Sequence, residues 1–208
     1  MVSGIDISHY NGSVDFGQLA AGAFAFVYVK ASEGRFTKDP LYAANYAGLQ
    51  QNQMLRGAYH FFYPQLNAQA QASNFLSVVT QLNAGDLPPV LDVEVSGEQT
   101  PSVIAAAMQQ WLDAVQQNLG RTPMIYTAAG FWNTALGGTT SFASYPLWVA
   151  EYTGNSSPRL PAGRGQRGNA GAGSHRSGRP GWPVPQAPAH PPSCARALVP
   201  YPHRPRHL

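Results

Sequence analysis

Two carboxylic acids two residues apart in an apolar stretch are the strongest chemical feature of the sequence. Asp92 and Glu94 interrupt the run of residues 89–95, and in a strand both side chains would lie on one face, about 6.6 Å apart along the chain. Repulsion and partial burial would then raise the pKa of one acid and keep it protonated while the other stays ionised. Glycoside hydrolysis requires such a pair. The alternative interpretation is two solvated acids at the rim of a sheet that have no chemical role.

A third acid, Asp6, interrupts a short alternating segment, residues 4–8. If that segment is an inward-facing strand of a parallel barrel, Asp6 would join Asp92 and Glu94 at the carboxyl ends of the strands, where such folds place active sites. The alternative interpretation is that Asp6 caps the turn at residues 9–12.

Aromatic residues on several expected strands fit a sugar-binding cleft. Tyr59, Tyr126 and Trp148 offer rings that stack on sugar C–H surfaces and polar groups that hydrogen-bond. Packing in the core is the commoner role of any one such residue. His60 has no second His or Cys nearby, so we expect it to be a core histidine and predict neither a metal site nor a cofactor.

The elements that must position these residues alternate between strands and helices. Strands are predicted at residues 4–8, 23–30, 58–63, 89–95, 123–127 and 147–152, and helices at 40–55, 66–82 and 101–119. The last helix is best marked, with Thr100 as N-cap, Pro101 at its first position and Gly120 just past its end. Repeated strand–helix–strand units predict an α/β fold with a mostly parallel sheet, open or closed into a barrel.

Charge divides the 208 residues into two parts. Residues 1–158 contain all ten acids and five bases, a net charge of −5, whereas residues 159–208 contain eight Arg and no acid. The overall pI near 9.1 therefore describes neither part and argues poorly for a nucleic-acid binder. The longest apolar run, residues 23–29, is too short to span a membrane. No signal peptide is recognised, and the single Cys194 excludes an internal disulfide.

The regular pattern stops near Gly163. From Pro158 onward the chain holds eleven of its eighteen prolines, and it shows neither helical nor strand periodicity. We therefore predict a domain of residues 1–162 and a disordered Arg/Pro/Gly-rich tail of residues 163–208. A weaker alternative is that this tail binds nucleic acid or another anionic surface.

Five blocks of the chain resemble, in order, the lysozymes of glycoside hydrolase family 25, and the resemblance covers roughly residues 2–162. The blocks are GIDISHYNG at residues 4–12, FVYVKASEG at 26–34, GAYHF at 57–61, PVLDVE at 89–94 and PLWVAEY at 146–152.

The resemblance implies an irregular β/α (TIM-like) barrel that cleaves the β-1,4 bond between N-acetylmuramic acid and N-acetylglucosamine. By position, Glu94 would be the general acid, Asp92 would stabilise a positively charged intermediate, and Asp6 would be a further active-site carboxylate. The side chains expected to contact substrate are those of Glu33, Tyr59, Tyr126 and Trp148. The implied partner is peptidoglycan, which lies outside the cytoplasmic membrane. The protein would act there as a monomer and would bind neither nucleic acid nor membrane.

The chain departs from the family after Ala162. Family members continue with a strand ending near Trp-Gln-Tyr and a final strand carrying Val-Asp, and neither block is present. The abrupt change suggests a reading-frame shift in GC-rich coding DNA, and the alternative is a natural low-complexity tail. We therefore expect a barrel that lacks its last two strands, which exposes unpaired backbone at the gap. The rival to an active enzyme is an inactive or peptidoglycan-binding remnant of one.

Overall fold

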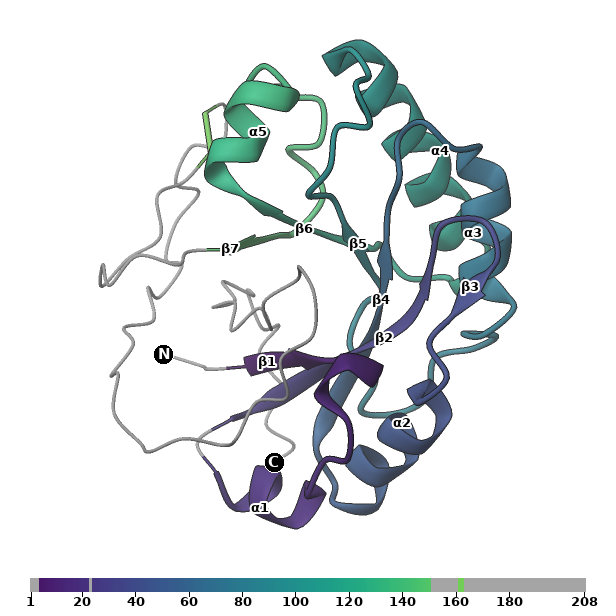
Figure 1. Cartoon of the computed structure of the whole chain (residues 1–208), viewed down its shortest axis with the longest axis vertical. Coiled ribbons are helices and arrows are strands. Elements are labelled where there is room, and N and C mark those ends of the chain that lie inside the picture. The colour runs from purple at the N-terminus through teal and green to yellow at the C-terminus, as the bar shows by residue number, and fades with distance from the viewer. Residues whose placement is uncertain (1–3, 23, 151–160, 163–208) are drawn as a thin grey trace, which may run out of the picture.

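A curled, mostly parallel sheet organises the computed structural model, which describes residues 4–22, 24–150 and 161–162 (Figure 1). Six strands pair in the order β1-β2-β4-β5-β6-β7, all parallel, and a short β3 pairs antiparallel with β2. The strands are β1 (Gly4–Ile7), β2 (Phe26–Glu33), β3 (Thr37–Lys38), β4 (Leu55–Phe61), β5 (Val90–Asp92), β6 (Met124–Ala128) and β7 (Leu147–Ala150).

Helices connect the strands and cover the outer face of the sheet (Figure 1). They are η1 (His9–Asn11, a 3₁₀ turn), α1 (Phe16–Ala21), α2 (Tyr42–Gln51), α3 (Ala68–Leu76), α4 (Pro101–Leu119) and α5 (Ala129–Ala135). This strand–helix alternation is the βαβ arrangement predicted from the sequence, because parallel neighbours need a crossover connection. Three of these elements, η1, α1 and α5, were not predicted, since each spans only two turns or fewer.

Strand β5 is shorter than the sequence predicts. It ends at Asp92, so the expectation of one strand carrying both Asp92 and Glu94 is wrong. The pairing partners explain the early end: Asp92 is the last residue of β5 in register with both β4 and β6. The last residues of the predicted strand 147–152 and the predicted tail lie outside the described residues.

Helix α4 follows the signals in its sequence. Pro101 occupies its first turn, and Gly120 ends it in the left-handed conformation, at φ 64°, which glycine adopts without steric cost. Its apolar stripe buries Ile104, Met108 and Trp111 completely. Thr100 is the N-cap residue, but its side chain makes no capping hydrogen bond.

Of the three apolar clusters in the described residues, two lie on opposite faces of the sheet. The outer core packs α3 and α4 against the sheet and contains Phe75 and Trp111. The inner core fills the concave side with aromatic rings, among them Phe26, Tyr28 and Trp148. Tyr28 and Trp148 pack with ring centroids 5.1 Å apart. Burial on both faces explains why β2 reads as a nearly continuous apolar run.

Strands β1 and β7 stand at the two ends of the strand order, and among the described residues no backbone pairing joins them. The described sheet is therefore an arc, a half-barrel with helices outside (Figure 1). Within the same residues, no helix is both long and apolar enough to cross a membrane.

Candidate active site

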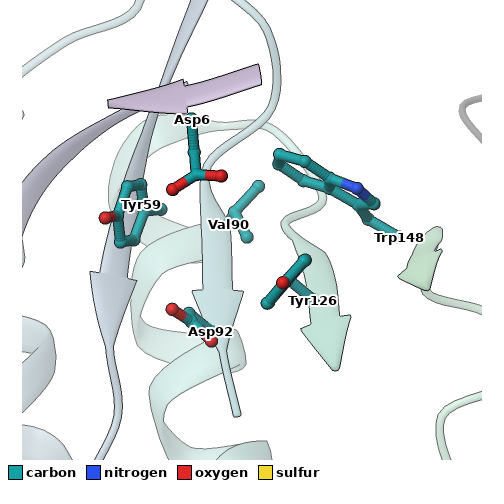
Figure 2. Close-up of a pocket in the computed structure, with 6 residues that line it drawn as sticks. All are labelled: Asp6, Tyr59, Val90, Asp92, Tyr126 and Trp148. Atoms are coloured by element: carbon teal, nitrogen blue, oxygen red, sulfur yellow. The ribbon is translucent and has the colours of Figure 1, made fainter. Parts of the chain in front are cut away.

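A pocket on the concave side of the sheet gathers five polar or aromatic side chains that the sequence singled out. Figure 2 shows the carboxyl groups of Asp6 and Asp92 facing this pocket, with the Tyr59 ring on one side and the rings of Tyr126 and Trp148 on the other. Val90 completes its lining. The five come from β1, β4, β5, β6 and β7, which are far apart in the sequence.

Asp92 is a buried acid of the pocket with a raised pKa. Its residue is 7% exposed, and its Oδ1 atom has no hydrogen-bond partner among the described residues. Burial raises the pKa of the Asp92 carboxyl well above its usual range, and the negative charges of Glu94 and Asp6 raise it further. The Lys30 ammonium acts in the opposite direction. Burial and neighbouring negative charge therefore both favour the protonated form of Asp92.

Glu94 lies beyond the end of β5, yet the chain that carries it is firmly held. The Val93 amide donates to the Tyr126 carbonyl at 2.9 Å, and the buried Thr127 hydroxyl donates to the Val93 carbonyl at 2.7 Å. Val93 itself is fully buried. Because Val93 is anchored, Glu94 is held next to Asp92, half-buried, where its charge acts on the Asp92 carboxyl.

Tyr59 lies where the negative charges of the site converge. Burial raises the pKa of the Tyr59 phenol well above its usual range, and the charges of Asp6, Asp92 and Asp39 add to the effect, whereas a hydrogen bond with Ser8 opposes it. The phenol is thus a neutral hydrogen-bonding group between β1 and β5. Tyr126 and Trp148 meet edge to face on the other side, with centroids 5.0 Å apart.

Glu33, like Glu94, is not among the residues that line the pocket. It forms an ion pair with Lys30, three residues earlier on β2. An irregularity in β2 makes this possible, since Lys30 pairs with Tyr59 and Glu33 with Phe61, while Ser32 pairs with His60 between them. The extra residue in β2 is a β-bulge, which turns Lys30 and Glu33 to the same face.

Lys30, which was not predicted from the sequence, also acts on the site. Its ammonium lies 5.5 Å from the ring centroid of Tyr10 and 5.4 Å from that of Phe61, with the residue 6% exposed. The available signal was a lysine at the end of an apolar strand, which was predicted over residues 23–30. In a regular strand, in which side chains alternate between the two faces, Lys30 would share a face with Ser32 and not with Glu33.

A second missed pair stands beside β1. Asp39, which is buried, accepts hydrogen bonds from the His9 amide at 3.0 Å and the Leu41 amide at 3.0 Å, and it contacts the His9 ring at 2.7 Å. This pair fixes the chain immediately after Ser8, so it helps to set the position of β1 and of Asp6.

His60 points away from the pocket into the outer core. It is fully buried, stacks on Trp111 with centroids 5.7 Å apart and hydrogen-bonds Ser32 and Gln71. Within the described residues, no group of three or more His, Cys, Asp or Glu side chains is arranged to hold a metal ion.

Acidic and aromatic side chains from five parallel strands thus meet on the concave side of a curled sheet with helices outside it, as in a β/α barrel. The family model for glycosyl hydrolases family 25 matches residues 5–170, and the chain belongs to that family.

Curated relatives and solved structures agree with the family. The chain is 37% identical over 156 residues to protein YegX of Escherichia coli K12, covering 73% of this chain and 56% of that protein. It is 35% identical over 177 residues to Lysozyme M1 of Streptomyces globisporus, covering 78% of this chain and 58% of that protein. A bacterial lysozyme structure from Streptomyces coelicolor superposes with a TM-score of 0.74 at 32% identity, covering 78% of this chain and 79% of that one.

Proposed function

We propose that the chain is a peptidoglycan hydrolase that cleaves the β-1,4 bond between N-acetylmuramic acid and N-acetylglucosamine. The observation that carries this proposal is the Asp6–Asp92–Glu94 carboxyl cluster beside an aromatic pocket, in a member of glycosyl hydrolases family 25. Relatives named as lysozyme and muramidase support it. The chain spans only 56–58% of the length of the first two relatives cited above, so their activity enters here as a proposal.

The proposed mechanism divides two roles between Glu94 and Asp92. Because the carboxyl groups interact, a proton belongs to the cluster as a whole. Asp92 is ionised in the reactive complex, where it stabilises the positive charge that develops on the sugar as the glycosidic bond breaks, and the proton resides on Glu94. Glu94 then donates it to the leaving oxygen as general acid. Its half-buried position is open to the leaving group, unlike that of Asp92.

The remaining residues bind and orient the sugar in this proposal. Tyr59, with its pKa raised, stays neutral and donates a hydrogen bond near Asp6, which assists orientation or the attacking water. Tyr126 and Trp148 form an aromatic wall against which a sugar ring packs. Glu33, which pairs with Lys30, contacts substrate from β2. It is in register with Asp92, two strands away.

The wider organisation follows from the same proposal. We propose residues 1–162 as the catalytic domain, built as a TIM-like barrel that lacks its last two strands, with residues 163–208 as a separate tail. The protein would act on the cell wall as a monomer, with no nucleic-acid or membrane partner. The tail lies outside the described residues.

Clearing of a purified peptidoglycan suspension tests the proposal, with identification of the new reducing ends. We expect the parent chain to clear the suspension and to leave N-acetylmuramic acid at the new reducing ends. Glu94→Gln should slow release by about a hundredfold to ten-thousandfold. Glu98→Gln, an exposed acid four residues further along, is the matched control and should behave like the parent.

A folded parent chain that sediments with peptidoglycan but releases no reducing ends would contradict hydrolysis. That result would instead support the peptidoglycan-binding remnant, for which the unpaired ends of the described sheet are the structural argument.

A further inference from the structure

The segment that follows Glu33 carries exposed side chains, two of them basic and one aromatic, at the same end of the sheet as the carboxyl cluster. Arg35 and Phe36 lie between β2 and β3, and Thr37 and Lys38 form β3; all four are exposed. Phe36 is 79% exposed, and the Arg35 guanidinium lies over its ring at 5.1 Å from the centroid. An exposed phenylalanine by itself needs no explanation. Two properties of this hairpin, residues 33–38, do need an explanation: its firmly held backbone and its two basic side chains.

A buried side chain from α3 holds the hairpin. The Asn74 amide nitrogen lies 3.2 Å from the Glu33 carbonyl oxygen, 3.0 Å from that of Gly34 and 3.0 Å from that of Thr37. The Gly34 amide also donates to the Phe61 carbonyl at 3.2 Å. The hairpin is thus fastened to α3 and β4, so its exposed side chains are presented on a preorganised backbone.

The hairpin also carries the two basic side chains that make no ion pair or backbone hydrogen bond among the described residues before Ser157. Of the five Lys and Arg residues before Ser157, Lys30 pairs with Glu33 and Arg56 with Asp86. Arg121 donates to the Asp86 carbonyl at 2.7 Å, before the amino ends of β5 and β6. The other two are Arg35 and Lys38, and neither makes an ion pair with any described residue.

The hairpin lies within reach of a substituent on a sugar bound at the pocket. Glu33, Phe61 and Asp92 are register partners on β2, β4 and β5. Two strand spacings of about 4.8 Å therefore separate the start of the turn from Asp92, or about 10 Å. Four residues of extended peptide span about 13 Å.

We propose that the hairpin binds the carboxylates of the short peptides that muramic acid carries in peptidoglycan. The inference rests on the proposed function, because it places the glycan in the pocket and its peptide on the hairpin. The Arg35 fork suits a bidentate carboxylate contact, and Lys38 supplies a second charge nearby. Phe36 packs against the aliphatic part of the peptide. The hairpin thereby distinguishes peptide-bearing from bare glycan.

Binding to two soluble ligands tests the proposal. The first is uncross-linked peptidoglycan chains with their peptides, and the second is the same chains after an amidase has removed the peptides. The full chain is used with Glu94→Gln, which prevents cleavage during calorimetric titration. We expect Arg35→Gln with Lys38→Gln to weaken binding to the first ligand about tenfold and to leave binding to the second unchanged.

Matched variants separate a specific contact from net charge. Gln110→Glu with Gln117→Glu changes the net charge by the same two units on the exposed surface of α4 and should leave both affinities unchanged. Exchanging the two cations, Arg35→Lys with Lys38→Arg, should retain most of the binding. The difference between ligands should shrink at high salt, because exposed charges are screened.

Equal weakening toward both ligands, or no weakening at all, would overturn the hairpin proposal while leaving the hydrolase proposal intact. Failure of the parent to bind or cleave either ligand would overturn both.

Discussion

Lys30 and Glu33 form an ion pair across a β-bulge in β2, so that a cation and an anion three residues apart both face the concave side of the sheet. The Lys30 charge also reaches Asp92 two strands away, where it lowers the pKa of a carboxyl that burial and like charges raise. The buried Lys30 ammonium therefore interacts with both Glu33 and Asp92.

The first prediction concerns Lys30. Lys30→Met removes the charge that favours ionised Asp92, so the pKa of that carboxyl should rise further and the acidic limb of the pH–activity profile should move to higher pH. Lys30→Arg keeps the charge and should keep the profile near that of the parent. The measurement is the rate of peptidoglycan clearing from pH 4 to 8. A uniform loss of activity with an unmoved profile would show that Lys30 only supports the fold.

The second prediction is that replacing Asp92 abolishes activity and increases stability. The pKa of Asp92 is raised in the folded protein, so the carboxyl favours folding below about pH 4 and loses that contribution as pH rises toward its folded-state pKa. Asp92→Asn removes this dependence. It should therefore stabilise the protein by about 0.5–2 kcal/mol at pH 7 while abolishing clearing.

Denaturant unfolding measures that change, and Asp113→Asn on the exposed face of α4 is its control, with an expected change under about 0.5 kcal/mol. A destabilised Asp92→Asn protein would mean that the carboxyl makes a contact in the fold that outweighs its burial.

The third prediction concerns His60, whose protonation state follows from its partners. Gln71 Oε1 accepts from the Tyr63 amide at 3.0 Å, so it also accepts from His60 Nε2, and the Ser32 hydroxyl donates to His60 Nδ1 at 2.8 Å. Burial lowers the pKa of the ring to about 3, so the ring is neutral, with its proton on Nε2 and with Nδ1 as the acceptor of the Ser32 hydroxyl.

Acidification should therefore destabilise the protein through His60. From about pH 6.5 down to about pH 3 the unfolded chain binds a proton at this ring and the folded chain does not, which costs about 1.4 kcal/mol per pH unit over most of that range. His60→Gln should lower stability at pH 7 but flatten this slope. Urea unfolding of both proteins from pH 4 to 7 measures the difference, and parallel curves would contradict the assignment.

The fourth prediction concerns Asn74, which holds the hairpin. Asn74→Ala leaves the carbonyls of Glu33, Gly34 and Thr37 without their shared donor and should cost about 1–3 kcal/mol. Asn118→Ala is the control, because its amide contacts only the Ala114 carbonyl on the exposed side of α4. Thermal unfolding compares the two, and equal losses would show that the hairpin does not depend on Asn74.

Local signals in the sequence determined most of the architecture. The helix from Pro101 to Leu119 was predicted at both ends, because its proline, its glycine and its apolar stripe act over a few residues. The six strands of the parallel sheet were predicted for the same reason, although their ends shifted by up to three residues. The candidate residues Asp6 and Asp92 also stood out, since an acid inside an apolar strand is a local anomaly.

Only the tertiary structure decided which of these residues meet. The bulge that turns Lys30 toward the acids depends on pairing with β4, and the hold on the hairpin depends on Asn74, about forty residues away along the chain. The early end of β5 at Asp92 likewise depends on its neighbours. Pairing register and side-chain contacts between distant segments leave no periodic trace in the sequence, because they are set by the packing of elements that local patterns describe one at a time.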